Sequence, residues 1–197
     1  MTTNQNQFDK TVDVLVVGSG CGGLTAALTA NISNGSKVLV IEKSNLIGGT
    51  SATSGGVIWI PNNHHAEQAG AVDSTKDAKD YLKATIPADE FNEPMIDSYL
   101  ENGPKMVKFM EDHTDVSYTS LEHYPDYFQD APGVKLGNRA LEPSPVSADT
   151  LEDDVDNLHP SGPQTILFGR YGVNFEESHA FTTQSPGWLK LFLKNVR

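Results

Sequence analysis

The chain has 197 residues, of which 38% are hydrophobic and 20% are charged, so it holds enough apolar material for a buried core. Its formal net charge of −12 at pH 7 argues against nucleic acid or an anionic membrane surface as a partner. No apolar run approaches the length of a membrane span, and no N-terminal stretch resembles a signal peptide. Cys21 is the single cysteine and can form no internal disulfide, which fits a reducing compartment. We therefore expect a cytoplasmic protein with no integral membrane segment.

The first structural signal is the pattern of a βαβ unit near the N-terminus. The apolar run Val12–Val17 is typical of a parallel strand that is buried on both faces. Residues 24–32 favour a helix, and residues 38–41 form a second apolar run that ends directly before Glu42. Between the first strand and the helix, three glycines have the spacing G-x-G-x-x-G: Gly18, Gly20 and Gly23. This order of strand, glycines, helix, strand and acid predicts a Rossmann-like dinucleotide-binding unit.

Each part of this pattern has a physical reason. Gly18 allows a sharp turn from strand to helix, Gly20 lets a pyrophosphate approach the backbone, and Gly23 allows close packing of helix and strand. The pyrophosphate would lie at the helix N-terminus, where free N–H groups and the helix dipole favour anions. Glu42 would accept hydrogen bonds from ribose hydroxyls and would repel a ribose phosphate, which disfavours a phosphorylated nicotinamide cofactor. This unit alone leaves a nicotinamide and a flavin open.

A second glycine-rich segment follows the acid and favours a flavin. Residues 48–56 read GGTSATSGG, and VIWIPNN comes next. A loop of this composition offers many N–H groups and hydroxyls, which suits a long ligand with a second phosphate and a polar ring edge. The alternative is a flexible linker of small residues. The residues expected to bind FAD are Gly18, Ser19, Gly20, Gly22, Gly23, Glu42, Lys43, Gly48, Gly49, Thr50, Ser51, Ser54, Gly55 and Gly56.

These stretches resemble a known family of flavoproteins. VVGSGCGGLTAAL, then EK, then GGTSATSGGVIWIPNN are similar to the FAD-binding start of the group that includes fumarate reductase and 3-ketosteroid dehydrogenases. The 3-ketosteroid Δ1-dehydrogenase branch is the most similar, because YPDYFQDAPG at 124–133, GNRALEP at 137–143 and LFGRYG at 167–172 also resemble it. The resemblance implies an α/β fold, FAD as cofactor, and 1,2-dehydrogenation of a 3-ketosteroid with transfer of electrons to an acceptor.

The resemblance also implies a tyrosine in the active site near the flavin. The spacing of YPDYF leaves Tyr124 and Tyr127 both possible as the catalytic residue. Without the family, these aromatic side chains are equally explained as anchors that hold a loop to the surface.

Helices are expected after the glycine-rich segments. The first spans about residues 76–86, and the second begins after Asn92. The pair 103–104, Gly-Pro, is expected to break the path before a third helix over about 104–112. Adjacent His64 and His65 are expected in a loop, where they make poor paired ligands, so no metal site is predicted.

The remaining chain shows little periodicity. Residues 118–164 are rich in Pro, Gly, Asp and Ser and are typical of a functional loop. A strand over 165–168, a turn over 169–172 and an amphipathic helix opened by Pro186-Gly187 are expected after it.

The predicted organisation is an incomplete α/β domain with a helical insertion. It begins with a disordered N-terminus (1–10), an FAD-binding βαβ core (11–62) and the helical insertion (63–117). A loop-rich segment near the active site (118–164) follows, and then a strand and helix that lead into a missing C-terminal part (165–197). A single βαβ unit cannot complete a doubly wound sheet, so we expect the chain by itself to be inactive. Two alternatives stay open: a flavoprotein that reduces a dicarboxylate such as fumarate, and an inactive FAD-binding fragment.

Overall fold

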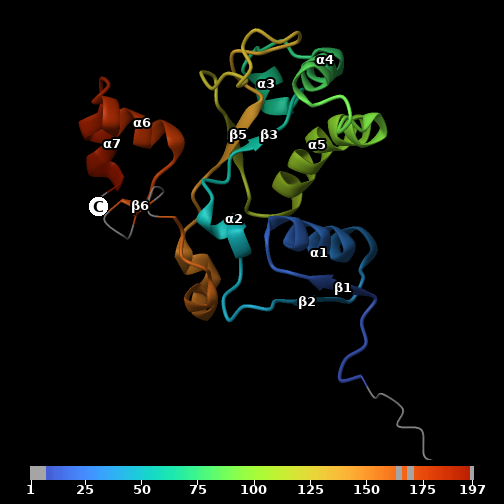
Figure 1. Cartoon of the computed structure of the whole chain (residues 1–197). Helices are drawn as coiled ribbons and strands as arrows, with labels where there is room; N and C mark the ends of the chain where they lie inside the picture. The colour runs from blue at the N-terminus through green and yellow to red at the C-terminus, as the bar shows by residue number, and fades with distance from the viewer. Residues whose placement is uncertain (1–7, 163–165, 168–170, 196–197) are drawn as a thin grey trace, which may run out of the picture. The chain divides into compact units, whose positions relative to one another are not determined.

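The computed structural model describes residues 8–162, 166–167 and 171–195, and Figure 1 shows their course. The chain divides into two compact units. The first combines the described part of Met1–Thr53 with Leu151–Pro160, and the second combines Ser54–Thr150 with the described part of Ser161–Arg197. The first unit is built on a parallel βαβ motif, which confirms the α/β class predicted from the sequence.

The βαβ motif forms where the sequence pattern places it. Strand β1 pairs in parallel with β2, with Val14 opposite Val38 and Val17 opposite Ile41. Helix α1 connects them and ends at Gly35, whose positive φ of 64° lets its N–H reach the carbonyl of Asn31 at 2.8 Å. The elements are β1 (Val14–Val17), α1 (Cys21–Asn34) and β2 (Val38–Ile41).

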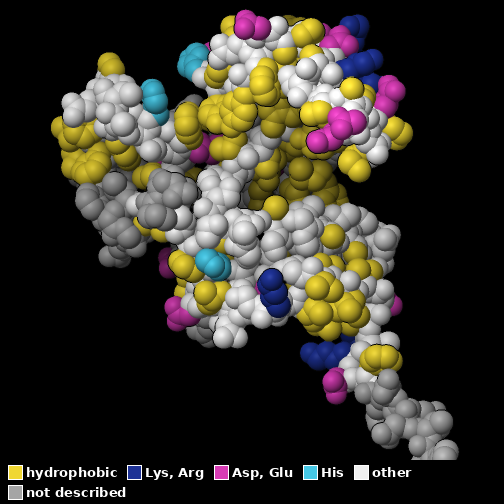
Figure 2. All heavy atoms as spheres, in the orientation of Figure 1, with side chains coloured by type: hydrophobic (Ala, Val, Ile, Leu, Met, Phe, Trp, Pro, Cys, Tyr) yellow, Lys and Arg dark blue, Asp and Glu magenta, His cyan; other side chains and the backbone are white. Residues whose placement is uncertain are grey.

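One face of β1 is exposed, which corrects the expectation of a strand buried on both faces. Leu15 is 55% exposed and Val17 is 77% exposed, while Val14 and Val16, which alternate with them, are half-buried. Figure 2 shows hydrophobic side chains gathered on the surface over β1. The physical reason is that the described residues of this sheet form only two strands, so one face has no covering layer.

The second glycine-rich segment is partly helical rather than a loop. Residues 49–53 form the short helix α2 (Gly49–Thr53). Ile47, just before it, forms a parallel bridge to Leu158, and its carbonyl accepts the N–H of His159 at 2.8 Å. This bridge joins the segment to the end of η1 (Ala148–Asn157), a 3₁₀ segment that contains the acidic run.

A three-stranded antiparallel sheet forms the core of the second unit. Strand β5 (Ala140–Pro143) lies between β3 (Ile58–Trp59) and β4 (Tyr118–Ser120). Leu141 of β5 is fully buried and packs with Ile60 and Val107. The expectation of a loop throughout 118–164 is therefore wrong in part, because β4 and β5 of this segment pair with each other and β5 also pairs with β3.

The helices of this unit correct two further expectations. Asn63 caps α3, so His64 and His65 begin a helix rather than lie in a loop. A single helix, α5, replaces the two expected around residues 103–104, because Gly103 packs against Ile60 and burial of this face offsets the hydrogen bond that Pro104 removes. The helices are α3 (His64–Gln68), α4 (Thr75–Thr85), capped by Ser74, and α5 (Glu93–His113), capped by Asn92.

The C-terminal part of the second unit adds a hairpin and two helices. A strand is confirmed at Ile166–Leu167, whereas Tyr171–Gly172, expected in a turn, forms its antiparallel partner. Two residues of the expected strand, Thr165 and Phe168, lie outside the described residues. So do the first two residues of the expected turn, Gly169 and Arg170. The last elements are β6 (Ile166–Leu167), β7 (Tyr171–Gly172), α6 (Phe175–Thr183) and α7 (Trp188–Asn195), the last being the helix expected after Pro186-Gly187. None of the described helices is long and apolar enough to span a membrane.

Candidate functional site

The glycine turn between β1 and α1 has the close packing that the motif requires. Gly18 has a φ of 100°, a conformation that disfavours any side chain. A Cβ added at Gly23 would lie 2.2 Å from the carbonyl oxygen of Gly18. Only glycine therefore lets α1 start this close to the end of β1.

The N-terminus of α1 is open to an anion. Its N-cap is Gly20, with no side-chain cap, and its first turn holds no acidic residue. The N–H of Cys21 donates to Ser51 Oγ at 3.0 Å, but within the described residues the N–H groups of Gly22 and Gly23 have no acceptor. A Cβ at Gly22 would meet nothing within 4 Å. Free amides, the helix dipole and open space together fit the diphosphate of a dinucleotide.

Glu42 connects the first glycine turn to the second glycine-rich segment. Its Oε2 accepts the N–H of Ser19 at 2.9 Å and the hydroxyl of Ser19 at 2.7 Å. The Ser19 oxygen in turn accepts the N–H of Gly48 at 2.9 Å. Hydrogen bonds from the Ser44 N–H and from Ser19 lower the pKa of Glu42 to about 2, so the carboxylate is charged at neutral pH. These bonds leave about one of its four acceptor positions for a ribose hydroxyl.

We expect Glu42→Gln to lower stability in a pH-dependent way. The pKa of about 2 in the folded protein lies below the ordinary value of 4.5, so the stabilisation is present in full above pH 4.5 and is lost as the pH falls toward 2. Thermal melts of both proteins from about pH 7 down to about pH 2 measure this. The difference in Tm is expected to stay constant above 4.5 and to shrink below it. An equal difference at both ends of the range would contradict the prediction.

The other residues predicted to bind FAD fall in two places. Gly49 lies against the turn, because a Cβ on it would be 3.7 Å from Gly20 Cα. Thr50 follows Gly49 in the first turn of α2, and Lys43 is exposed in the bend after β2. The remaining three, Ser54, Gly55 and Gly56, belong to the second unit. There, Ser54 Oγ accepts the N–H of Gly56.

The second unit contains an aromatic cavity of about 260 Å³ that holds both candidate tyrosines. The hydroxyls of Tyr124 and Tyr127 are 3.3 Å apart. Tyr127 is 81% exposed, whereas Tyr124 is half-buried and meets Phe175 edge-on at 5.2 Å. The hydrogen bond with Tyr127, followed by burial, raises the pKa of Tyr124. The cavity is lined by Val57, Trp59, Tyr81, Leu82, Tyr124, Pro125, Asp126, Tyr127 and Ala140.

A buried charge network beside this cavity was not predicted from the sequence. The guanidinium of Arg139, 2% exposed, bonds Asp73 through Nε and Nη2 at 2.9 and 2.7 Å, and Asp126 through Nη1 at 2.7 Å. It also lies 5.4 Å from the ring centroid of Trp59, whose Nε1 donates to Asp126 at 2.7 Å. The network therefore fixes the Trp59 ring that lines the cavity. The only sequence signal was the position of Arg139 in GNRALEP.

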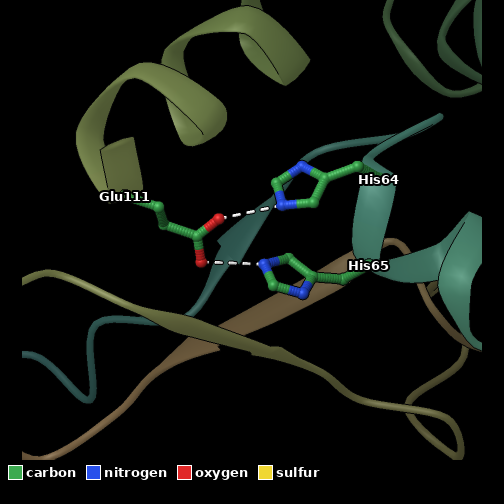
Figure 3. Close-up of side chains that lie close together, drawn as sticks. All are labelled: His64, His65 and Glu111. Carbon is green, nitrogen blue, oxygen red and sulfur yellow. Dashed lines mark hydrogen bonds and ion pairs between the residues drawn. The ribbon is translucent and has the colours of Figure 1, made fainter. Parts of the chain in front are cut away.

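A second cluster not predicted from the sequence joins α3 and α5. His64 Nε2 lies 2.9 Å from Glu111 Oε2, and His65 Nε2 lies 2.8 Å from Glu111 Oε1, as Figure 3 shows. The two histidines were considered as ligands at the sequence level, but Glu111 lies on another helix and has no recognisable spacing to them.

The parallel βαβ unit and the anion-accepting N-terminus of α1 define a dinucleotide-binding protein. A family model described as an FAD binding domain matches residues 13–149. The chain belongs to this family of FAD-binding flavoproteins, and FAD is the cofactor of its fold.

The chain is similar to dehydrogenases that are much longer. A 4-oxocyclohexanecarboxylate 2-dehydrogenase from Sinomonas cyclohexanicum is 40% identical over 173 residues, which are 87% of this chain and 29% of that protein. A 3-oxosteroid 1-dehydrogenase from Mycobacterium tuberculosis is 41% identical over 150 residues, which are 76% of this chain and 26% of that protein. The crystal structure of 3-ketosteroid Δ1-dehydrogenase from Sterolibacterium denitrificans, in complex with 1,4-androstadiene-3,17-dione, has a TM-score of 0.86 and 38% identity and covers 94% of this chain and 32% of that one. The chain thus spans less than a third of each relative.

Proposed function

We propose that this chain holds FAD in a dehydrogenase that introduces a double bond beside a ring ketone, with 1,2-dehydrogenation of a 3-ketosteroid as its specific reaction. The relatives support this class, because both names describe removal of hydrogen from a ring that bears a ketone. Two observations carry the proposal, one within each unit: the open N-terminus of α1 in the first, and an aromatic cavity that presents a tyrosine hydroxyl in the second.

The residues at the start of α1, together with Glu42, would bind and orient the cofactor. The free N–H groups of Gly22 and Gly23 would receive the diphosphate, and the remaining acceptor position of Glu42 would receive a ribose hydroxyl. Bound FAD would supply the hydride acceptor of the reaction.

Tyr124 is the better of the two candidate catalytic tyrosines. It is half-buried in the cavity wall, whereas most of the Tyr127 side chain faces solvent. A tyrosine that removes a proton needs a lowered pKa, but the hydrogen bond with Tyr127 raises the pKa of Tyr124. We therefore assign Tyr124 as a hydrogen-bond donor to the ketone oxygen, which stabilises the charge that develops there as the neighbouring C–H is deprotonated.

The cavity favours an uncharged ketone over a dicarboxylate. Among the described residues that line it there is no Lys or Arg, and Arg139 beneath it already pairs with Asp73 and Asp126. A site for fumarate or succinate needs cationic groups to bind the carboxylates. A cavity of about 260 Å³ is close to the lower end of ligand pockets, roughly 300 Å³, so it suits the ketone-bearing ring of a steroid.

Anaerobic flavin reduction tests this proposal. The chain by itself is expected to show no bleaching, so the test uses an FAD-loaded enzyme that contains this chain together with the C-terminal part that its relatives have. In that enzyme we expect 4-androstene-3,17-dione to bleach the visible absorption and succinate to leave it unchanged. Tyr124→Phe is expected to slow bleaching by about 100-fold, the usual effect of losing one donor to a developing oxyanion. Tyr127→Phe keeps the Tyr124 hydroxyl and is expected to slow it less.

Three results would contradict the proposal in different ways. Bleaching by succinate would favour the dicarboxylate alternative. Bleaching by 4-oxocyclohexanecarboxylate but not by the steroid would indicate that the substrate is a small ring ketone. An FAD-loaded enzyme that contains the C-terminal part as well, and that no substrate bleaches, would be the inactive alternative.

A further inference from the structure

The cluster of His64, His65 and Glu111 has the composition of a metal site. One nitrogen of each imidazole and a carboxylate oxygen all lie within 4.8 Å of one another. The three side chains converge from the start of α3 and the last turns of α5, as Figure 3 shows. Their side chains are 28%, 20% and 17% exposed, so a dissolved ion can reach them while much of the bulk water is excluded.

The fold holds these donors in place before any ion binds. Asn63 caps α3 by accepting the N–H of Ala66 at 2.9 Å, and its amide donates to the carbonyl of Ile60 at 2.7 Å. Glu111 is held from the other side, because its Oε1 accepts the N–H of Tyr118 at 2.9 Å. The start of α3, which carries the two histidines, and the carboxylate of Glu111 are therefore each held by hydrogen bonds.

We propose that His64, His65 and Glu111 bind a divalent transition-metal ion of the zinc class. Two imidazoles with one carboxylate suit zinc and its neighbours, whereas calcium and magnesium prefer oxygen ligands alone. Bonds of about 2.0–2.2 Å to a tetrahedral ion place the ligand atoms roughly 3.4 Å apart. His64 and His65 lie 2.9 and 2.8 Å from different oxygens of Glu111, so a carboxylate that binds through one oxygen has to open one of these separations by about half an ångström. The three ligand atoms already lie within 4.8 Å of one another.

The ion would act as a cross-link within the second unit. It would join the start of α3 to the end of α5, although His65 and Glu111 are 46 positions apart in the sequence. Three protein donors leave a fourth position for water. In the competing interpretation, Glu111 only accepts hydrogen bonds from the imidazoles. That interpretation predicts no affinity for a metal ion.

Calorimetric titration of the chelator-treated protein with Zn²⁺ is the test, together with Co²⁺ as a spectroscopic probe. We expect one equivalent of Zn²⁺ to bind, and Co²⁺ to give the intense visible bands of a four-coordinate ion. His64→Gln and His65→Gln, made separately, are each expected to weaken Zn²⁺ binding by about 100-fold or more, because loss of a group that only orients a ligand already costs about 10- to 100-fold. His113→Gln is the matched control: it removes an exposed imidazole from α5 that contacts Phe109 and not the cluster.

Every outcome decides the proposal. It is upheld by binding that the two cluster variants weaken and the control does not, with circular dichroism showing that the variants are folded. Absence of binding overturns it, as does binding of equal strength in His64→Gln and the original protein. If one cluster variant fails to fold, the other variant and the Co²⁺ spectrum distinguish the metal site from the hydrogen-bonded cluster.

Discussion

Replacing Arg139 with methionine is expected to lower the free energy of unfolding by about 3–5 kcal/mol, the usual cost of removing one partner from a buried ion pair. The methionine would fill much of the volume but leave the carboxylates of Asp73 and Asp126 without their cation. Both carboxylates keep backbone donors, which limits the loss but does not replace the charge. The Trp59 ring would also lose the guanidinium beside it.

Urea denaturation followed by tryptophan fluorescence measures this loss. The matched control is Lys105→Met, which removes an ion pair with Glu101 whose side chains are 64% and 68% exposed, and we expect less than about 1 kcal/mol there. Adding Asp73→Asn and Asp126→Asn to Arg139→Met is expected to recover part of the stability, because no buried charge is then unpaired. A loss of less than about 1 kcal/mol for Arg139→Met alone would contradict the account.

The sequence was sufficient for the βαβ motif because its signals are local. The spacing of Gly18, Gly20 and Gly23, the apolar runs and Glu42 lie within one short segment, and each constrains the backbone directly. The cap Asn92 was also readable, because a cap acts on amides two or three residues away. Such features need no knowledge of distant contacts.

The features that were missed depend on tertiary contacts. Gly103-Pro104 would break an isolated helix, but burial against Ile60 keeps α5 continuous. Strand β5 has no clear periodicity, because both of its edges are paired and most of it is buried. Hydrogen-bonded partners in the Arg139 network are up to 67 positions apart, and no local rule relates them.

Gly23→Ala is expected to weaken FAD binding by roughly 10- to 100-fold. Its methyl group would lie 2.2 Å from the Gly18 carbonyl oxygen, so α1 has to move away from β1. Overpacking of this kind costs about 1–3 kcal/mol, and each 1.4 kcal/mol is a factor of ten in affinity if the strain falls on the binding-competent form. Gly22→Ala controls for folding, because a methyl group there would meet nothing within 4 Å, and thermal melts are expected to show a stable protein.

Calorimetric titration with FAD and with NAD tests most directly whether the start of α1 is a flavin-nucleotide site. The original protein is expected to release heat with FAD, to give little or none with NAD, and to lose most of its FAD affinity on Gly23→Ala. A clear signal with NAD and none with FAD would contradict the assignment, and unchanged FAD affinity in folded Gly23→Ala would place the diphosphate elsewhere.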